Sequence, residues 1–276
     1  MYESYWGLKE KPFENTPDPR FFYYSSQHEE SLYRLLYAVK EQKGAAMLSG
    51  VFGCGKTLIG RTILRELGKD IYRTAFITNP QLDYIELLMA IANSLGARDL
   101  PTKKTEVLTN VVLESIGTIL ENNLKDNKKT VVIIDEAHVI TDKYVWEGLR
   151  LLLNFQTEGR FLLTLLLLGQ PELKDIVDSN KQLSQRIAIR CHLGALSQED
   201  TVKYIHHRLN ISGATKHIFT EEVLGVIYTK SGGIPRRINQ ICDLALLTGL
   251  GRRAEKIDSG IIAEVTKDLE DGQEEF

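Results

Sequence analysis

The residues with the most specific chemistry are eight consecutive ones that read GVFGCGKT, from Gly50 to Thr57. They match the pattern G-x-x-x-x-G-K-[ST] at every defined position. Glycines let backbone N–H groups wrap around a phosphate without interference from Cβ atoms, and a following helix points its positive end at the anion. The pattern predicts that Lys56 reaches the β- and γ-phosphates of a nucleotide and that Thr57 binds Mg²⁺. We expect nucleotide contacts from Gly50, Gly53, Cys54, Gly55, Lys56, Thr57 and Leu58.

A second signal is the pair of acids Asp135 and Glu136, which directly follows the apolar residues 131–134. A strand that is buried on both faces and ends in acids delivers them to the carboxyl edge of a parallel sheet, where the loop above also lies. We expect Asp135 to hold Mg²⁺, usually through water, and Glu136 to polarise the attacking water. We expect His138 to be a neighbour of the site without a catalytic role.

Two further polar residues end predicted strands, and each has two interpretations. Gln170 either orients water beside the γ-phosphate and senses hydrolysis, or begins a turn before Pro171. Asn79 either hydrogen-bonds Glu136 and holds it inactive until a ligand arrives, or forms a turn before Pro80. Their place at strand ends makes them candidates, because ligands of open parallel sheets bind there.

Four arginines form a third group. Arg186 and Arg190 lie around the start of a predicted strand, and Arg236 and Arg237 open a predicted helix after SGGIP. A guanidinium suits a γ-phosphate because its planar fork gives two hydrogen bonds and it never deprotonates. The alternative for any single arginine is a solvated surface charge.

The elements that must position these residues alternate between apolar strands and helices. We predict strands at 45–50, 71–78, 130–137, 161–170 and 186–193. The alternation predicts an α/β fold with a five-stranded parallel sheet that has helices on both faces. After residue 195 the strands stop, and the sequence predicts a small all-helical domain. Its four helical stretches lie at about 198–210, 220–230, 235–248 and 258–270.

By pattern and composition the chain divides into four segments. Residues 1–27 form an arm rich in aromatic residues and proline, which we expect to pack on the body of the protein. Residues 28–195 form the nucleotide-binding core, residues 196–270 a helical lid, and residues 271–276 an acidic tail.

Composition excludes several classes of protein. The chain has 276 residues, of which 43% are hydrophobic and 26% charged, so we expect a folded globular protein. The net charge of -3 disfavours a globally basic nucleic-acid-binding protein and leaves room for a local basic patch. The three cysteines have neither metal-type spacing nor a disulfide framework, which favours a cytoplasmic protein. No apolar run approaches the roughly 20 residues that span a bilayer, and the opening is no secretory signal.

Several segments together resemble a known family. They are GVFGCGKT, VVIIDEAH, LLGQPEL, LSQRI and SGGIPRRINQICD. They are similar to the AAA+ ATPases, and more narrowly to the ATPase portion of the general secretion pathway protein A (ExeA/GspA-like) family. The opening, YxxxWGLKEKPFxxTPDPRFFY, resembles the N-terminal signature of that family. The resemblance covers about residues 2–250 and is more specific than the phosphate-loop pattern alone.

The resemblance implies an AAA+ P-loop core, a helical lid, and ATP with Mg²⁺ as ligands. Within it, Lys56 and Thr57 fall at the Walker A lysine and threonine. Asp135 and Glu136 fall at the Walker B acids, and Gln170 falls at the sensor 1 position.

The resemblance also implies a homo-oligomer, a ring or filament, with ATP held between subunits. Arg186 falls where a neighbouring subunit's arginine finger is expected, with Arg190 in reserve. Arg236 matches the sensor 2 arginine, which contacts the γ-phosphate in its own subunit.

The function expected from this resemblance is ATP hydrolysis by an oligomeric motor or switch that assists assembly of a cell-envelope secretion or pilus system. Members of the secretion family carry a membrane span and a peptidoglycan-binding part that this sequence lacks, so we expect a cytoplasmic protein that reaches the inner membrane through a protein partner. The alternative is an ATP-dependent DNA-binding regulator of transposition. In that case Lys103 and Lys104 would line a pore and contact phosphate backbones; otherwise they are solvated.

Overall fold

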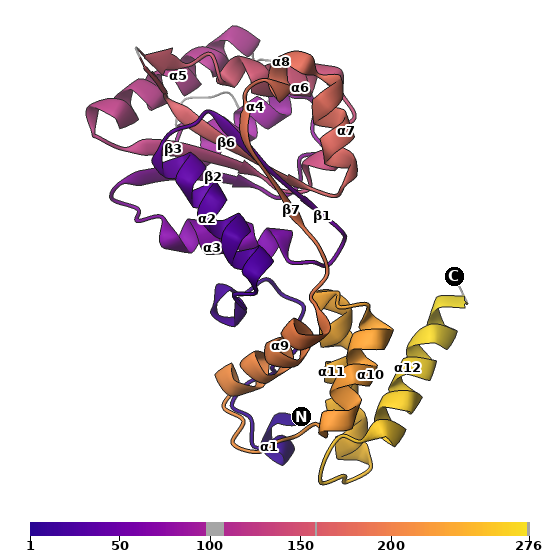
Figure 1. The fold of residues 1–276 in the computed structure, drawn as a ribbon. Coiled ribbons are helices and arrows are strands. Elements are labelled where there is room, and N and C mark those ends of the chain that lie inside the picture. Colours follow the sequence, from indigo (N-terminus) through magenta and orange to yellow (C-terminus); the bar gives the residue numbers. More distant parts are fainter. Residues whose placement is uncertain (98–107, 158, 275–276) are drawn as a thin grey trace. The chain divides into compact units, whose positions relative to one another are not determined.

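The computed structural model describes residues 1–97, 108–157 and 159–274. In it the chain forms two compact units. Unit 1 comprises Met1–Ser25, Gly53–Gly55 and Gly194–Phe276, and unit 2 comprises Ser26–Phe52 and Lys56–Leu193 (Figure 1). The chain therefore starts in unit 1, builds unit 2, and returns to unit 1.

Unit 2 is built on a five-stranded parallel sheet with the strand order β2-β3-β6-β1-β7. The strands are β1 (Ala45–Gly50), β2 (Tyr72–Ile77), β3 (Lys129–Ile134), β6 (Leu163–Gly169) and β7 (Ile187–Leu193). Every residue of β1 and β6 is buried, as expected of inner strands with helices on both faces. The predicted α/β core with a five-stranded parallel sheet is confirmed.

Two layers of helices cover this sheet. They are α2 (Ser26–Lys40) and α3 (Lys56–Glu66) on one face, and α4 (Tyr84–Ser94), α5 (Thr109–Lys125), α6 (Lys143–Leu152), α7 (Glu172–Ser179) and α8 (Lys181–Ser184) on the other (Figure 1). Alternate strand residues such as Met47 and Val132 pack in one core cluster with α4 to α8. On the opposite face, a Cβ added to Gly60 of α3 would lie 2.9 Å from a methyl carbon of Leu168, so glycine lets α3 approach β6 closely.

Two predicted strand boundaries in unit 2 are wrong, and two helices have no counterpart in the prediction. The strand predicted at 130–137 ends at Ile134, because the chain turns sharply after Asp135 into a short 3₁₀ helix, η3 (Ala137–Val139). The strand predicted at 161–170 starts at Leu163, since Arg160–Phe161 (β5) pair instead with Gln156–Thr157 (β4) in a short hairpin. Helices α7 and α8 carry weak patterns over few residues and were not predicted.

The C-terminal part of unit 1 is helical, as predicted. Its helices are α9 (Gln198–Ile211), α10 (Glu221–Ser231), α11 (Pro235–Gly251) and α12 (Ser259–Glu274). Their starts follow local chemistry: the Ser197 hydroxyl caps α9 by accepting from the Asp200 N–H at 3.0 Å, and Pro235 occupies the first turn of α11. Across residues 1–97, 108–157 and 159–274, no helix combines the length and the apolar character that crossing a bilayer requires.

The sequence suggests an arm at residues 1–27, and residues 1–25 of it belong to unit 1, where they contribute to its core. Tyr2, Trp6, Leu8 and Phe13 are buried in one cluster with the apolar faces of α9 to α12. The Trp6 indole N–H donates to the carbonyl of Leu246 at 2.9 Å, and the Tyr2 hydroxyl donates to Asp243. Trp6 lies in the short α1 (Glu3–Trp6), and another buried aromatic residue, Phe21, lies in the 3₁₀ helix η1 (Pro19–Phe21).

Arg208 of α9 is the charged group that ties this N-terminal segment to the helices. Its side chain is buried, and its guanidinium donates to the carbonyls of Pro12 and Glu14, the latter at 3.0 Å. It also donates to the Tyr204 hydroxyl at 2.8 Å and lies 4.7 Å from the centre of the Phe21 ring. A buried charge is tolerated when its donors are satisfied in this way.

We expect Arg208→Met to lower the free energy of unfolding of unit 1 by about 2–4 kcal/mol, because the buried carbonyl of Pro12 and the part-buried carbonyl of Glu14 lose their donor. Urea denaturation followed by near-UV circular dichroism of the buried aromatic residues measures this. The matched control is Arg252→Met, since Arg252 makes an exposed ion pair with Glu264, a pair type worth at most about 1 kcal/mol. Equal effects of the two substitutions would contradict the role of Arg208.

Candidate nucleotide-binding site

The loop between β1 and α3 has the backbone shape that its glycines predict. β1 ends at Gly50 and α3 starts at Lys56, so five residues turn the chain from strand to helix. Gly53 and Gly55 have φ values of +81° and +104°, in the left-handed region where a side chain is disfavoured. The loop leads directly into the N-terminus of α3, whose partial positive charge favours an anion.

Lys56 lies buried within this loop. Its ammonium donates to the carbonyl of Gly50 at 2.9 Å and to that of Val51 at 3.0 Å, and its side chain is only 4% exposed. These carbonyls satisfy a charge that would otherwise be costly to bury. The ammonium is thereby held at the loop to which the motif assigns phosphate.

Thr57 and Asp135 meet at the carboxyl edge of the sheet. The Thr57 hydroxyl donates to Asp135 Oδ2 at 2.6 Å, although 77 intervening positions separate them, and Asp135 Oδ1 accepts from the Glu136 N–H at 3.0 Å. Burial raises the pKa of Asp135 above its ordinary value, and the Glu136 charge adds to this, while the two hydrogen bonds oppose it. A hydroxyl and a carboxylate in contact are the oxygen ligands that Mg²⁺ prefers, so the residues present fit this ion.

Glu136 adopts an uncommon backbone conformation. Its φ and ψ are +52° and +34°, in the left-handed helical region, and it directly precedes η3. The turn gives the two consecutive acids different surroundings, since Asp135 is 3% exposed and the Glu136 side chain is 35% exposed. Strained backbone of this kind concentrates at functional sites. Glu136 is therefore placed to meet a solvent molecule while Asp135 is not.

His138 and Gln170 join the ends of two neighbouring strands. The backbone N–H of Gln170, directly after β6, donates to Nδ1 of His138 at 3.3 Å. The same nitrogen lies 3.4 Å from a carboxylate oxygen of Glu136. β3 and β6 pair with Ile134 opposite Leu167, which explains why residues after these two strands meet. His138, which we expected to be only a neighbour of the site, contacts both Gln170 and Glu136. Its position two residues after Glu136 was the feature of the sequence that could have indicated these contacts.

The two candidate arginine fingers lie away from this edge. Arg186 directly precedes β7, whose Ile187 pairs with Ala45 at the start of β1, whereas the phosphate loop follows the other end of β1. At a rise of about 3.3 Å per residue, the six residues of β1 separate these ends by roughly 17 Å. The structure therefore does not bring Arg186 together with Lys56 of its own chain.

Both arginines have partners in their own unit. Arg186 donates to the carbonyl of Leu153 at 2.7 Å. Arg190 forms an ion pair with Asp178 at 2.8 Å and donates to the Ser184 hydroxyl at 2.7 Å. Among the described residues, Arg190 thus has two polar partners within unit 2, whereas Arg186 has one.

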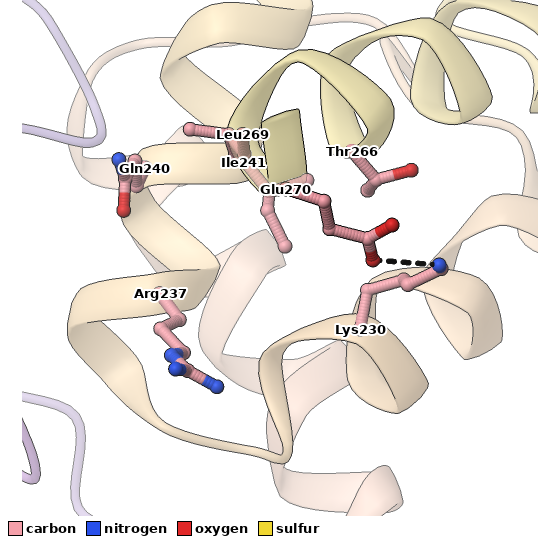
Figure 2. A pocket seen from close by; sticks show the side chains of 7 residues that line it. All are labelled: Lys230, Arg237, Gln240, Ile241, Thr266, Leu269 and Glu270. Atoms are coloured by element: carbon pink, nitrogen blue, oxygen red, sulfur yellow. Dashed lines mark hydrogen bonds and ion pairs between the residues drawn. The ribbon is translucent and has the colours of Figure 1, made fainter. Parts of the chain in front are cut away.

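Arg236 and Arg237 lie at the start of α11 in unit 1. They are consecutive, so their side chains leave the helix in directions about 100° apart. Arg237 lines a pocket of about 200 Å³ formed by α10, α11 and α12, together with residues of the Lys230–Glu270 ion pair at 2.9 Å (Figure 2). The two arginines therefore have separate surroundings.

The five remaining candidates are Asn79, Cys54, Leu58, Lys103 and Lys104. Asn79 is exposed after β2, and among the described residues no hydrogen bond connects it to Glu136. Cys54 is buried in the phosphate loop, and Leu58 is half-buried in the first turn of α3. Lys103 and Lys104 lie outside the residues that the structure describes.

Comparison with solved structures supports the fold. The Aeropyrum pernix ORC1 protein in complex with DNA is similar with a TM-score of 0.70 and 16% identity, over 94% of this chain and 69% of that one. Cdc6p from Pyrobaculum aerophilum is similar with a TM-score of 0.70 and 18% identity, over 91% of this chain and 70% of that one. These likenesses confirm the predicted AAA+ P-loop fold with a helical C-terminal region.

Comparison of sequences is more specific. A family model described as "AAA domain" matches residues 39–177, about half of the chain. General secretion pathway protein A of Aeromonas hydrophila is 39% identical over 266 residues, which are 95% of this chain and 47% of that protein. The chain thus spans about half the length of this relative. It belongs to the AAA domain family, and within that family it is similar to the general secretion pathway protein A type.

Proposed function

We propose that this chain binds Mg-ATP at residues 50–57 and hydrolyses it to ADP and phosphate. The observation that carries the proposal is the hydrogen bond between Thr57 and Asp135, since it joins the phosphate loop to the acidic strand end. Lys56 in the loop and Glu136 beside the bond complete the set of groups that phosphoryl transfer requires. AAA domain family membership and the helical unit agree with this assignment.

The reaction follows from these positions. Lys56 exchanges its carbonyl partners for oxygens of the β- and γ-phosphates. Thr57 and Asp135 hold Mg²⁺, which when bound neutralises charge on those oxygens. Glu136 accepts a hydrogen bond from a water molecule, whose oxygen bonds to the γ-phosphorus as the bond to the β-phosphate oxygen breaks; the proton of that water passes to Glu136 and then to solvent. Gln170, half-buried at the end of β6, orients this water or senses its reaction.

Arg186 supplies positive charge to the nucleotide of a neighbouring subunit. Its place at the amino edge of the sheet supports this, because a residue there is distant from the nucleotide of its own chain. A homo-oligomer, closed as a ring or open as a filament, brings such an arginine to the next subunit. Arg190 is the second choice, and Arg236 is proposed to contact the γ-phosphate within its own chain.

The cellular role is proposed from the sequence relative. Similarity to a general secretion pathway protein supports an ATP-driven oligomer that assists assembly of a cell-envelope secretion or pilus system. We place it on the cytoplasmic side, where an inner-membrane protein partner recruits it. Binding of DNA, as in a regulator of transposition, is the alternative that the first experiment below tests.

Glu136→Gln should retain ATP and lower turnover by about 10²- to 10⁴-fold, because the amide binds water without accepting its proton. Light scattering with ATP and Mg²⁺, with and without a short DNA duplex, measures the assembly of this variant. Assembly with ATP alone, indifferent to DNA at low salt, agrees with the envelope role. Assembly that requires or captures DNA selects the alternative. The control is Lys56→Ala, which should bind no ATP and remain unassembled in both conditions.

Arg186→Ala should lower turnover by at least about 100-fold with ATP affinity nearly unchanged, because a finger acts on the transition state. Mixing this variant with Lys56→Ala tests whether it acts between subunits. Lys56→Ala subunits bind no ATP but offer an intact Arg186, so a mixture should be more active than either variant alone. Arg190→Ala is the matched comparison. If its mixture recovers and that of Arg186→Ala does not, the assignment passes to Arg190.

A further inference from the structure

We propose that a pocket between the C-terminal helices receives a glutamate side chain of a protein partner, whose carboxylate is bound by Arg237. The inference goes beyond ATP hydrolysis, because the pocket contains no residue of the phosphate loop or of the acidic strand end. It assigns a role to Arg237, which follows Arg236 in the sequence and takes no part in the reaction proposed above.

Two helix faces form this pocket, which we call the Arg237 pocket. On each helix the lining residues are spaced three and four positions apart, so they lie on one face. They are Arg237, Gln240 and Ile241 of α11, and Thr266, Leu269 and Glu270 of α12 (Figure 2). Lys230, near the end of α10, adds a further side chain to the lining.

Three charged groups line the pocket, and two of them neutralise each other. The Lys230 ammonium lies 2.9 Å from Oε1 of Glu270, and the dashed line in Figure 2 marks this ion pair. Among the described residues, no ion pair or hydrogen bond engages the guanidinium of Arg237. Arg237 also lies in the first turn of α11, which contains no acid and where the helix dipole disfavours a cation. The pocket therefore has an excess positive charge that an anion would neutralise.

The size and the walls of the pocket limit what can occupy it. Its volume of about 200 Å³ is smaller than the roughly 300–1,000 Å³ of sites that enclose a whole small molecule. Ile241 is 4% exposed and Leu269 is partly buried, so part of the wall is apolar. An occupant that joins methylene groups to a charged end would cover this apolar wall and reach the guanidinium.

The charges favour a carboxylate over a phosphate. A planar guanidinium forms two parallel hydrogen bonds with a carboxylate, and the exposed amide of Gln240, one turn further along the same face, is a further donor. The carboxylate of Glu270 repels any anion in the pocket. It repels a phosphate, with nearly two charges, about twice as strongly as a carboxylate with one. Aspartate has one methylene fewer than glutamate to cover the apolar wall.

The pocket fits the side chain of a protein better than the free amino acid. Free glutamate carries an ammonium and a second carboxylate, and both would need partners. Lys230 and Glu270 already satisfy each other, so they offer no free charge to these groups. A glutamate within a polypeptide has neither charge and brings only its side chain to Arg237. The occupant is therefore a glutamate on the surface of a protein partner.

Nuclear magnetic resonance of the arginine side chains tests this binding without nucleotide. In the full chain with ¹⁵N-labelled arginine, the Nε–H signals are recorded while the capped peptide acetyl-Ala-Glu-Ala-amide is added. Arg237→Gln identifies the signal by its loss. We expect a saturable shift with half-saturation in the millimolar range. The peptide acetyl-Ala-Gln-Ala-amide should bind at least about fivefold more weakly, because it lacks the charge.

Four results would overturn the proposal. They are no shift of the Arg237 signal, equal shifts from the two peptides, tighter binding of inorganic phosphate or of free L-glutamate, and a shift caused by raising the concentration of the chain alone. The last result would assign the pocket to a second copy of this chain. Because no nucleotide is present, each result is independent of whether the chain hydrolyses ATP.

Substitutions in the ion pair provide a second test with opposite signs. Glu270→Gln removes the repelling carboxylate, so the glutamate peptide should bind about two- to fivefold more tightly. Lys230→Met leaves Glu270 free to engage Arg237, so the peptide should bind about two- to fivefold more weakly. All three side chains belong to exposed residues, so the urea midpoint of unfolding should stay nearly unchanged in these variants.

Lys203→Met is the matched control for loss of a positive charge. Lys203 forms an exposed ion pair with Glu199 at 2.6 Å within α9, and neither residue lines the Arg237 pocket. This variant should bind the glutamate peptide as the unmodified chain does, because salt screens exposed charges at a distance. Equal weakening by Lys203→Met and Lys230→Met would contradict the proposal, since net charge alone would then determine the affinity.

Discussion

The hydrogen bond of 2.6 Å between the Thr57 hydroxyl and Asp135 is the contact on which the site depends. It exists because parallel strands bring their carboxyl ends to one edge, so the loop after β1 and the acids after β3 become neighbours once β6 is inserted between those strands. Asp135 is buried where it makes this contact, and the chain turns immediately after it. The left-handed conformation of Glu136 is that turn, and it directs the second acid towards solvent.

The residues of the site are positioned in two ways, by the strands of the sheet and by the short turns that follow them. The pairing register of the strands fixes where the phosphate loop, Asp135 and Gln170 lie, since each follows the end of a buried strand. Glu136, His138 and Gln170 lie one step further out, on the short turn after β3 and at the residue after β6. The register of the sheet thus decides which of these residues meet.

The sequence alone was sufficient for the strands of the core, the four C-terminal helices and the phosphate loop, because apolar runs and glycine spacing act locally. It was insufficient for His138, since its partners depend on the turn at Glu136 and on which strand lies beside β3. It also left open where the first 25 residues pack. Their aromatic pattern indicates burial, but the partners, such as Leu246 for Trp6, lie more than 200 positions away in sequence. The action of Arg186 on a neighbouring subunit remains a prediction from the family resemblance.

The shared core of residues 1–25 and α9 to α12 has a consequence for how the protein is made. During synthesis the N-terminal segment emerges first, but the helices that bury Tyr2, Trp6 and Phe13 are translated after the whole of unit 2. Unit 2 contains all of its own strands and is able to fold while the ribosome is still translating α9. The first segment must wait with its aromatic side chains exposed, and in the finished unit it makes contacts of far greater sequence separation than those of an ordinary helical bundle.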